Sequence, residues 1–289
     1  MTDGAAVLLV LGAALSWGIA QTVTKLGLSR MDTVCFATLR AILGLLLVVP
    51  YGFLTGAFRF ENPWLIGVAA FAGLIDSFLG TLLYMYALKR GEAHRAAALA
   101  NTAPFWGVAT AVLLLGEPAR PTIFLAALLV VAGTYFLVSP KDGGQGPRSP
   151  LAGMAALGTA ILWGIAETGP AKYCLDRGMA PVEFQVVLAG TAAAAWGLVA
   201  LFHRRLDIHP SGVRIAAFTA FTGFFLGWML WLSGLKLAQA SLLTPIRGGA
   251  MTISAFFVSV LFLGERPSQR AWLGALLACG GVVLATISA

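Results

Sequence analysis

Residues 157–168 read LGTAILWGIAET and repeat residues 11–22, LGAALSWGIAQT, at eight of twelve positions. Three further landmarks recur in the same order at offsets of 147 to 148 residues. The first landmark is the set Pro63, Phe71, Phe78, Gly80, Leu88 and Lys89, which recurs as Pro210, Phe218, Phe225, Gly227, Leu235 and Lys236. The second is Leu115-Gly116-Glu117, which recurs as Leu263-Gly264-Glu265. The third is Ala127-Leu128-Leu129 with Gly133, which recurs as Ala275-Leu276-Leu277 with Gly281. Chance similarity between apolar helices explains one such match but not four, so the chain contains an internal duplication.

Composition places both copies of the repeat in a membrane. Of the 289 residues, 59% are hydrophobic and 11% are charged, whereas a soluble domain is about 25% charged. A bilayer-spanning helix takes about 20 mostly apolar residues. Ten apolar runs of about that length occur, at 5–24, 33–54, 64–88, 94–115, 120–138, 151–171, 181–202, 212–235, 240–263 and 269–288. We therefore expect an all-α integral membrane protein with ten transmembrane helices.

One segment, 139–150, is predicted to be a linker because its twelve residues include three prolines and three glycines. It separates a five-helix repeat at 1–138 from a second one at 151–289. A unit with five spans ends on the side of the membrane opposite to its start, so its tandem copy enters inverted. Inverted repeats with a substrate site between them are the architecture of many secondary transporters. The span count therefore predicts alternating access through a central cavity.

Loop charges predict the orientation of the chain. The loops that follow odd-numbered spans carry twelve Lys and Arg residues, and the loops on the other side carry five. The positive-inside rule then places both termini outside the cytoplasm. Since no basic run is longer than Lys89-Arg90 or Arg204-Arg205, we expect the lipid bilayer and not nucleic acid as the partner of this chain.

Motifs for enzyme chemistry are absent from the sequence. There is no H-E-x-x-H, G-x-S-x-G or C-x-x-C, and no phosphate-binding G-x-x-x-x-G-K-[ST]. The three cysteines, Cys35, Cys174 and Cys279, are scattered along the chain, which argues against a disulfide framework and a zinc cluster. We expect no enzyme activity, no metal and no cofactor. Transport would then be driven by an ion gradient or by the gradient of the substrate, not by ATP hydrolysis.

Several segments resemble the drug/metabolite transporter superfamily, specifically its ten-span EamA-type members. They are the early Trp17-Gly18 and Trp163-Gly164, Arg40 in the second span, the stretch from Pro104 to Gly116-Glu117, and the Ala-Leu-Leu-x-x-x-Gly of the fifth and tenth spans. One position departs from this pattern. In the second half Thr252 stands where the proline is expected, and Pro245 lies earlier instead.

The resemblance covers nearly the whole chain, and within the family it is nearest to bacterial YddG-type exporters of aromatic amino acids. It implies a multi-pass transporter of the bacterial inner membrane that takes a small amphipathic metabolite. We expect this transporter to be a monomer.

Four candidate substrate-binding residues are equivalent in pairs within the repeat. Gln21 and Glu167 each follow a tryptophan, Trp17 or Trp163, by four residues, so both halves present an indole beside a polar tip on one helical face. The indoles would wall the substrate, with a cation–π contact to its ammonium group. The alternative is that these tryptophans belong to an interfacial belt.

Charged residues inside spans are the next candidates, since a charge at the bilayer centre costs about 2.5–3.5 kcal/mol. Asp76 would bind a substrate amine or a proton, or else remain neutral and hydrogen-bonded to Ser77 or a neighbouring helix. Arg247 would bind a substrate carboxylate, or else pair with an acid such as Glu167 or Glu265.

Further candidates come from a proline and from aromatic residues. Asn101 lies before Pro104 in the fourth predicted span, and a proline frees backbone groups that are tolerated where they face a cavity. Tyr84 in the third span and Trp228 or Trp231 in the eighth are predicted walls of the cavity.

Other ionisable residues lie near the predicted span ends. We expect Arg40, Glu117 and Glu265 to set helix ends, topology or gate salt bridges instead of contacting substrate. His94, His203 and His209 are interpreted as solvated loop residues.

The sequence as a whole predicts a secondary transporter that exports amino acids or similar small metabolites. A multidrug or cationic-compound exporter is the alternative within transport, and it would need a membrane-embedded acid. An intramembrane enzyme or a receptor is the alternative outside transport.

Overall fold

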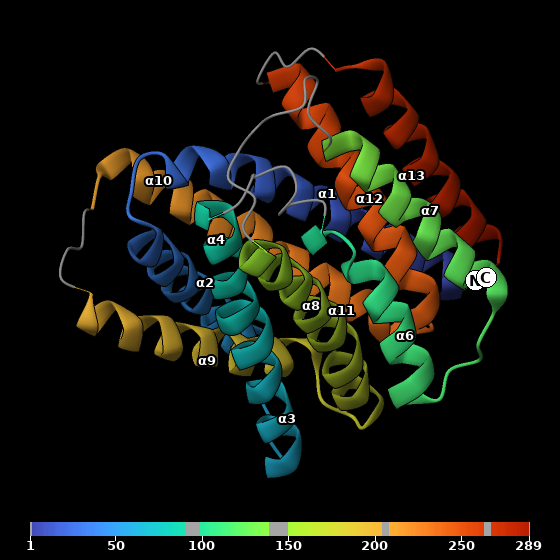
Figure 1. Ribbon diagram of the computed structural model, residues 1–289. Helices are drawn as coiled ribbons and strands as arrows, with labels where there is room; N and C mark the ends of the chain where they lie inside the picture. The colour runs from blue at the N-terminus through green and yellow to red at the C-terminus, as the bar shows by residue number, and fades with distance from the viewer. Residues whose placement is uncertain (1, 91–98, 139–149, 204–207, 263–266, 289) are drawn as a thin grey trace.

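The computed structural model describes residues 2–90, 99–138, 150–203, 208–262 and 267–288, and within these ranges all of the regular secondary structure is helical (Figure 1). The first half contains α1 (Thr2–Leu28), α2 (Thr33–Thr55), α3 (Pro63–Gly73), η1 (Leu74–Gly80), α4 (Thr81–Arg90), α6 (Ala103–Leu115) and α7 (Pro121–Val138). The second half contains α8 (Pro150–Asp176), α9 (Pro181–Phe202), α10 (Pro210–Thr219), η2 (Ala220–Gly227), α11 (Trp228–Leu237), α12 (Ala240–Phe262) and α13 (Gln269–Ile287). The predicted linker lies outside the described residues except for Pro150, as do His94 and Glu265.

Eight helical stretches in the described ranges are long and apolar enough to cross a membrane. Large apolar side chains such as Leu54, Leu113 and Phe202 are exposed on the helices, as expected where lipid is the solvent. The two remaining apolar helices, α6 and α7, are shorter. The chain is thus an all-helical multi-pass membrane protein.

The fourth predicted span differs most from its prediction. The sequence predicts a helix over 94–115, but α6 begins only at Ala103, after a turn at Asn101 and Thr102. Two local features explain the turn: Pro104 occupies the first turn of α6, a position that proline favours, and the Thr102 hydroxyl donates to the Leu99 carbonyl. Asn101 therefore lies in a turn between the helical residues 99–100 and α6, instead of within one continuous helix, which corrects the prediction.

The two halves pack reciprocally. Helix α1 of the first half contacts α10, η2, α11 and α12 of the second, whereas α8 of the second half contacts α3, η1, α4 and α6 of the first. A glycine makes each approach close. A Cβ on Gly18 would lie 2.8 Å from the Met251 carbonyl on α12, and a Cβ on Gly164 would lie 2.7 Å from the Ala103 carbonyl on α6. The glycines that follow Trp17 and Trp163 thus lie at points of close helix packing.

Helices α2 and α9 run antiparallel. A carboxylate at the start of each helix contacts the end of the other helix. Asp32 caps α2 through the Val34 N–H and lies 3.1 Å from Nε2 of His203 at the end of α9. Glu183, in the first turn of α9, accepts from the backbone N–H groups of Arg59 and Phe60 after α2, at 2.6 and 2.7 Å. His203 lies just after α9 and its side chain is 35% exposed, as predicted for a residue at a span end, but it also contacts Asp32.

Glu117, which follows α6, fixes the start of α12. Its two carboxylate oxygens accept from the backbone N–H groups of Ala240 and Ser241, each at 2.8 Å. These groups have no partner within the helix, and a negative charge at a helix N-terminus is favourable. The prediction that Glu117 sets a helix end is confirmed.

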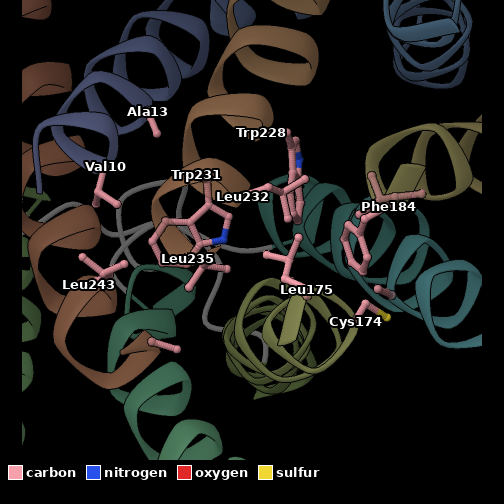
Figure 2. Packing of buried hydrophobic residues seen from close by; sticks show 14 of the residues in the cluster. Val10, Ala13, Cys174, Leu175, Phe184, Trp228, Trp231, Leu232, Leu235 and Leu243 are labelled. Atoms are coloured by element: carbon pink, nitrogen blue, oxygen red, sulfur yellow. The ribbon is translucent and has the colours of Figure 1, made fainter. Parts of the chain in front are cut away.

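The core is centred on α11. Figure 2 shows Trp228, Trp231, Leu232 and Leu235 projecting from α11 among Val10 of α1, Leu243 of α12 and Leu175 of α8. Since α1 belongs to the first half and the other three helices to the second, this core joins the two halves.

Candidate functional site

Two π-helical segments, η1 and η2, occupy equivalent places in the two halves and receive hydrogen bonds from the opposite half. The Trp163 indole N–H donates to the Asp76 carbonyl in η1 at 3.2 Å, and the Trp17 indole N–H donates to the Gly223 carbonyl in η2 at 2.7 Å. Asp76 and Gly223 are equivalent in the repeat, as are the two tryptophans. A wide π turn disturbs the α-helical bonding pattern, and in a membrane its carbonyls need donors from within the protein.

Other side chains complete this bonding. The additional donors are Trp196 to the Ser77 carbonyl (2.8 Å), Thr159 to that of Gly80 (3.2 Å), Ser16 to that of Thr222 (2.7 Å) and Gln185 to that of Phe224 (2.7 Å). Sequence reasoning missed Gln185 and Trp196. The sequence did contain a signal for both residues. Gln185 places a polar amide, and Trp196 an indole N–H, inside the apolar span 181–202, where an unsatisfied polar group is costly.

Glycines make room for both indoles. A Cβ on Gly80 would lie 2.7 Å from Nε1 of Trp163, and a Cβ on Gly227 would lie 2.6 Å from Nε1 of Trp17. Real Cβ atoms essentially never come this close to another heavy atom. The indoles are therefore held between a carbonyl and a glycine, a structural function that the prediction of indoles walling the substrate did not include.

A buried ion pair lies where the halves meet. Arg247 on α12 pairs with Glu167 on α8, and their side chains are 3% and 14% exposed. The guanidinium carbon of Arg247 lies 5.3 Å from the ring centroid of Trp17 and 4.8 Å from that of Trp231. The Trp231 indole N–H donates to the Glu167 backbone carbonyl at 2.9 Å. Arg247 was expected either to bind a substrate carboxylate or to pair with an acid, and in the structure it pairs with Glu167.

Asp76 faces a second polar group of residues. Its Oδ2 accepts from the Ser77 hydroxyl at 2.7 Å, while its buried Oδ1 has no hydrogen-bond partner among the described residues. Ser77 and Arg40 both line a cavity of about 30 Å³, which has room for a water molecule or two and is too small for an amino acid. Arg40 also lies over the Phe224 ring, 5.6 Å from its centroid. Arg40 lies inside α2 and lines this cavity, so of its three predicted roles the structure excludes that of setting a helix end.

The structure brings most of the predicted site residues together. Trp228 packs edge-on against Trp17, with ring centroids 5.8 Å apart, and Tyr84 packs against Trp163 at 5.4 Å. Trp17, Trp228, Glu167 and Arg247 therefore form one cluster, and Tyr84, Trp163 and Asp76 form another.

Two predicted residues lie apart from these clusters. Gln21 is exposed, although its repeat equivalent Glu167 is paired, and the first half has Leu99 where a counterpart of Arg247 would stand. Asn101 lies in the turn before α6.

Comparison with protein families identifies the chain. The model of the EamA-like transporter family matches it twice, at residues 4–139 and 151–287. The chain belongs to the EamA-like transporter family. The resemblance predicted from the sequence is thereby confirmed, and the chain is a membrane transporter and not an enzyme.

Individual relatives of this EamA-like chain are distant. The aromatic amino acid exporter YddG of Ancylobacter novellus is 27% identical over 235 residues, which cover 79% of this chain and 78% of YddG. The uncharacterized inner membrane transporter YicL of Salmonella typhimurium is 27% identical over 96% of this chain and 94% of YicL. A solved crystal structure shares the fold, with a TM-score of 0.84 at 23% identity over 99% of this chain and 98% of that one.

Metal binding has no support in the described part of the chain, where no group of three or more His, Cys, Asp or Glu side chains is placed to hold an ion.

Proposed function

We propose that this EamA-like chain is a secondary transporter that exports amino acids, aromatic ones among them, or similar small amphipathic metabolites across the bacterial inner membrane. The observation that carries the proposal is the Glu167–Arg247 pair, which is flanked by the indoles of Trp17 and Trp231 at the meeting of the two halves. Such a site offers both charges and an apolar wall. The relative YddG is an aromatic amino acid exporter, which agrees with this chemistry.

The proposed architecture is ten transmembrane helices in two inverted five-helix repeats, 1–138 and 151–289, joined by a linker at 139–150. Reciprocal contacts support it, because Trp17 reaches η2 as Trp163 reaches η1. Exchange of the conformations of two inverted halves would turn an outward opening into an inward one. We propose a monomer that works by alternating access around a central cavity, with both termini outside the cytoplasm.

The second candidate is a multidrug or cationic-compound exporter. The observation in its favour is Asp76, a buried acid in the middle of a candidate span whose Oδ1 has no partner in the described structure. A cationic cargo would need this carboxylate, so Asp76→Asn should abolish transport of such compounds. Transport of neutral amino acids that survives the substitution favours the first proposal.

Reconstitution into liposomes tests the proposed function. Purified protein should exchange radiolabelled phenylalanine, methionine or leucine across the bilayer in a counterflow assay, and measurement at two external pH values reports whether protons are coupled. Absence of exchange for every amino acid in the panel, with the protein folded and inserted, would overturn amino acid export.

A further inference from the structure

The Glu167–Arg247 pair has three properties that its role as a structural ion pair leaves unexplained. Its guanidinium lies against the Trp17 and Trp231 rings, and Nε of Arg247 is buried without a hydrogen-bond partner in the part of the chain that the structure describes. The Glu167 side chain retains partial exposure. Arg247 also has a conformationally fixed neighbour, because the Trp231 indole is hydrogen-bonded to the Glu167 carbonyl.

Charge balance restricts what ligand this pair is able to accept. Breaking a buried pair by removing one partner leaves an uncompensated charge, which is strongly unfavourable. An anionic ligand on Arg247 would release the Glu167 carboxylate without a counter-ion, and a cationic ligand on Glu167 would do the same to Arg247. A zwitterion avoids both costs, because each residue exchanges one opposite charge for another and the net charge of the site stays constant.

We propose that the pair opens to receive a zwitterionic α-amino acid, with the α-carboxylate on Arg247 and the α-ammonium group on Glu167. This inference rests on the proposed function and names the substrate class by charge. One carbon separates the two charged groups of an α-amino acid, so the residues need to part only far enough to admit it. The planar guanidinium presents a fork of N–H donors that matches a carboxylate, and its unused Nε–H belongs to that fork.

The adjacent rings favour an apolar or aromatic side chain. Trp17 comes from the first half and Trp231 from the second, and both have ring faces within cation–π range of the guanidinium. A ligand bound at the pair would contact both halves at once, as a substrate site for alternating access requires.

Competition in the counterflow assay tests the charge requirement. Exchange of labelled phenylalanine is measured against unlabelled phenylalanine, N-acetylphenylalanine, which lacks the ammonium group, and phenylalanine methyl ester, which lacks the carboxylate. Each single-charge analogue should need a concentration at least about tenfold higher than that of phenylalanine for the same inhibition, because each loses one charge-assisted contact. Equal inhibition by either analogue would overturn the inference while leaving the transporter function intact. No exchange of any amino acid would overturn the proposed function itself.

Substitutions locate the requirement in this pair. Glu167→Gln leaves Arg247 without its internal partner, so N-acetylphenylalanine should now compete better than phenylalanine, a reversal that a merely structural residue would not produce. The double variant Glu167→Gln with Arg247→Gln removes both charges together and should retain the fold while losing discrimination between phenylalanine and its analogues.

Matched controls make the same chemical changes elsewhere. Glu61→Gln and Arg270→Gln alter exposed residues outside the pair and should keep the selectivity of the unmodified protein. Retention of that selectivity by the folded double variant would overturn the assignment of the site.

Discussion

Gly80 and Gly227 are single residues on which the contact between the halves depends, because an added methyl group would meet an indole nitrogen at 2.7 or 2.6 Å. We expect Gly80→Ala and Gly227→Ala each to destabilise the protein by about 1–3 kcal/mol through overpacking. Thermal unfolding of purified protein in detergent checks this. Gly67→Ala is the control, since its Cβ would meet nothing within 4 Å. Melting temperatures equal to that of the control would contradict the close fit.

Glu117 is a residue whose effect should be confined to a helix end. Glu117→Ala removes the acceptor of the Ala240 and Ser241 N–H groups, and loss of an N-terminal cap costs about 0.5–2 kcal/mol. Glu117→Gln keeps one acceptor oxygen and should lie between the alanine variant and the unmodified protein in melting temperature. An alanine variant that melts at the same temperature as the unmodified protein would show that the cap contributes nothing.

The repeat pairs Trp17 with Trp163, and in the structure each indole donates to a carbonyl of the opposite half. The two contacts are equivalent because the backbone position that each tryptophan serves is duplicated. The equivalence does not extend to the surroundings of Gln21, which is exposed, whereas Glu167 pairs with Arg247 and the first half has Leu99 in place of that arginine. Charge pairing across helices is specific to individual side chains, so it does not follow from helical spacing within one segment.

At the scale of elements, hydropathy located the eight helical stretches that are long enough to cross a membrane but not the π segments. The runs 64–88 and 212–235 are mostly apolar over their whole length, and helical periodicity carries no mark of a wide turn inside them. What fixes η1 and η2 is a set of donors from distant helices, such as Trp163 for one and Trp17 and Gln185 for the other. Tertiary contacts of this kind are invisible to a local reading of the sequence.

These donors predict an effect across the two halves. Trp163→Phe keeps a ring but removes the N–H that serves the Asp76 carbonyl, and an unsatisfied buried carbonyl costs about 1–3 kcal/mol. Hydrogen exchange followed by mass spectrometry should therefore show faster exchange in η1 and unchanged exchange in η2. Trp17→Phe should show the opposite pattern. Equal acceleration of both segments by either variant would indicate general destabilisation instead of a specific contact.

At the scale of the whole molecule, the reciprocal packing implies that neither half folds alone. Helix α1 buries one side against α10, η2, α11 and α12, and α8 buries one side against α3, η1, α4 and α6, so each half lacks the surface that covers its own first helix. The fragments 1–138 and 151–289, expressed separately, should give little monodisperse protein in size-exclusion chromatography. Their co-expression should restore a stable complex, because the contacts that join the halves do not require the linker. A monodisperse, cooperatively melting fragment of either half would show that the repeat is an independent folding unit and that the interlocked arrangement forms only after each half is complete.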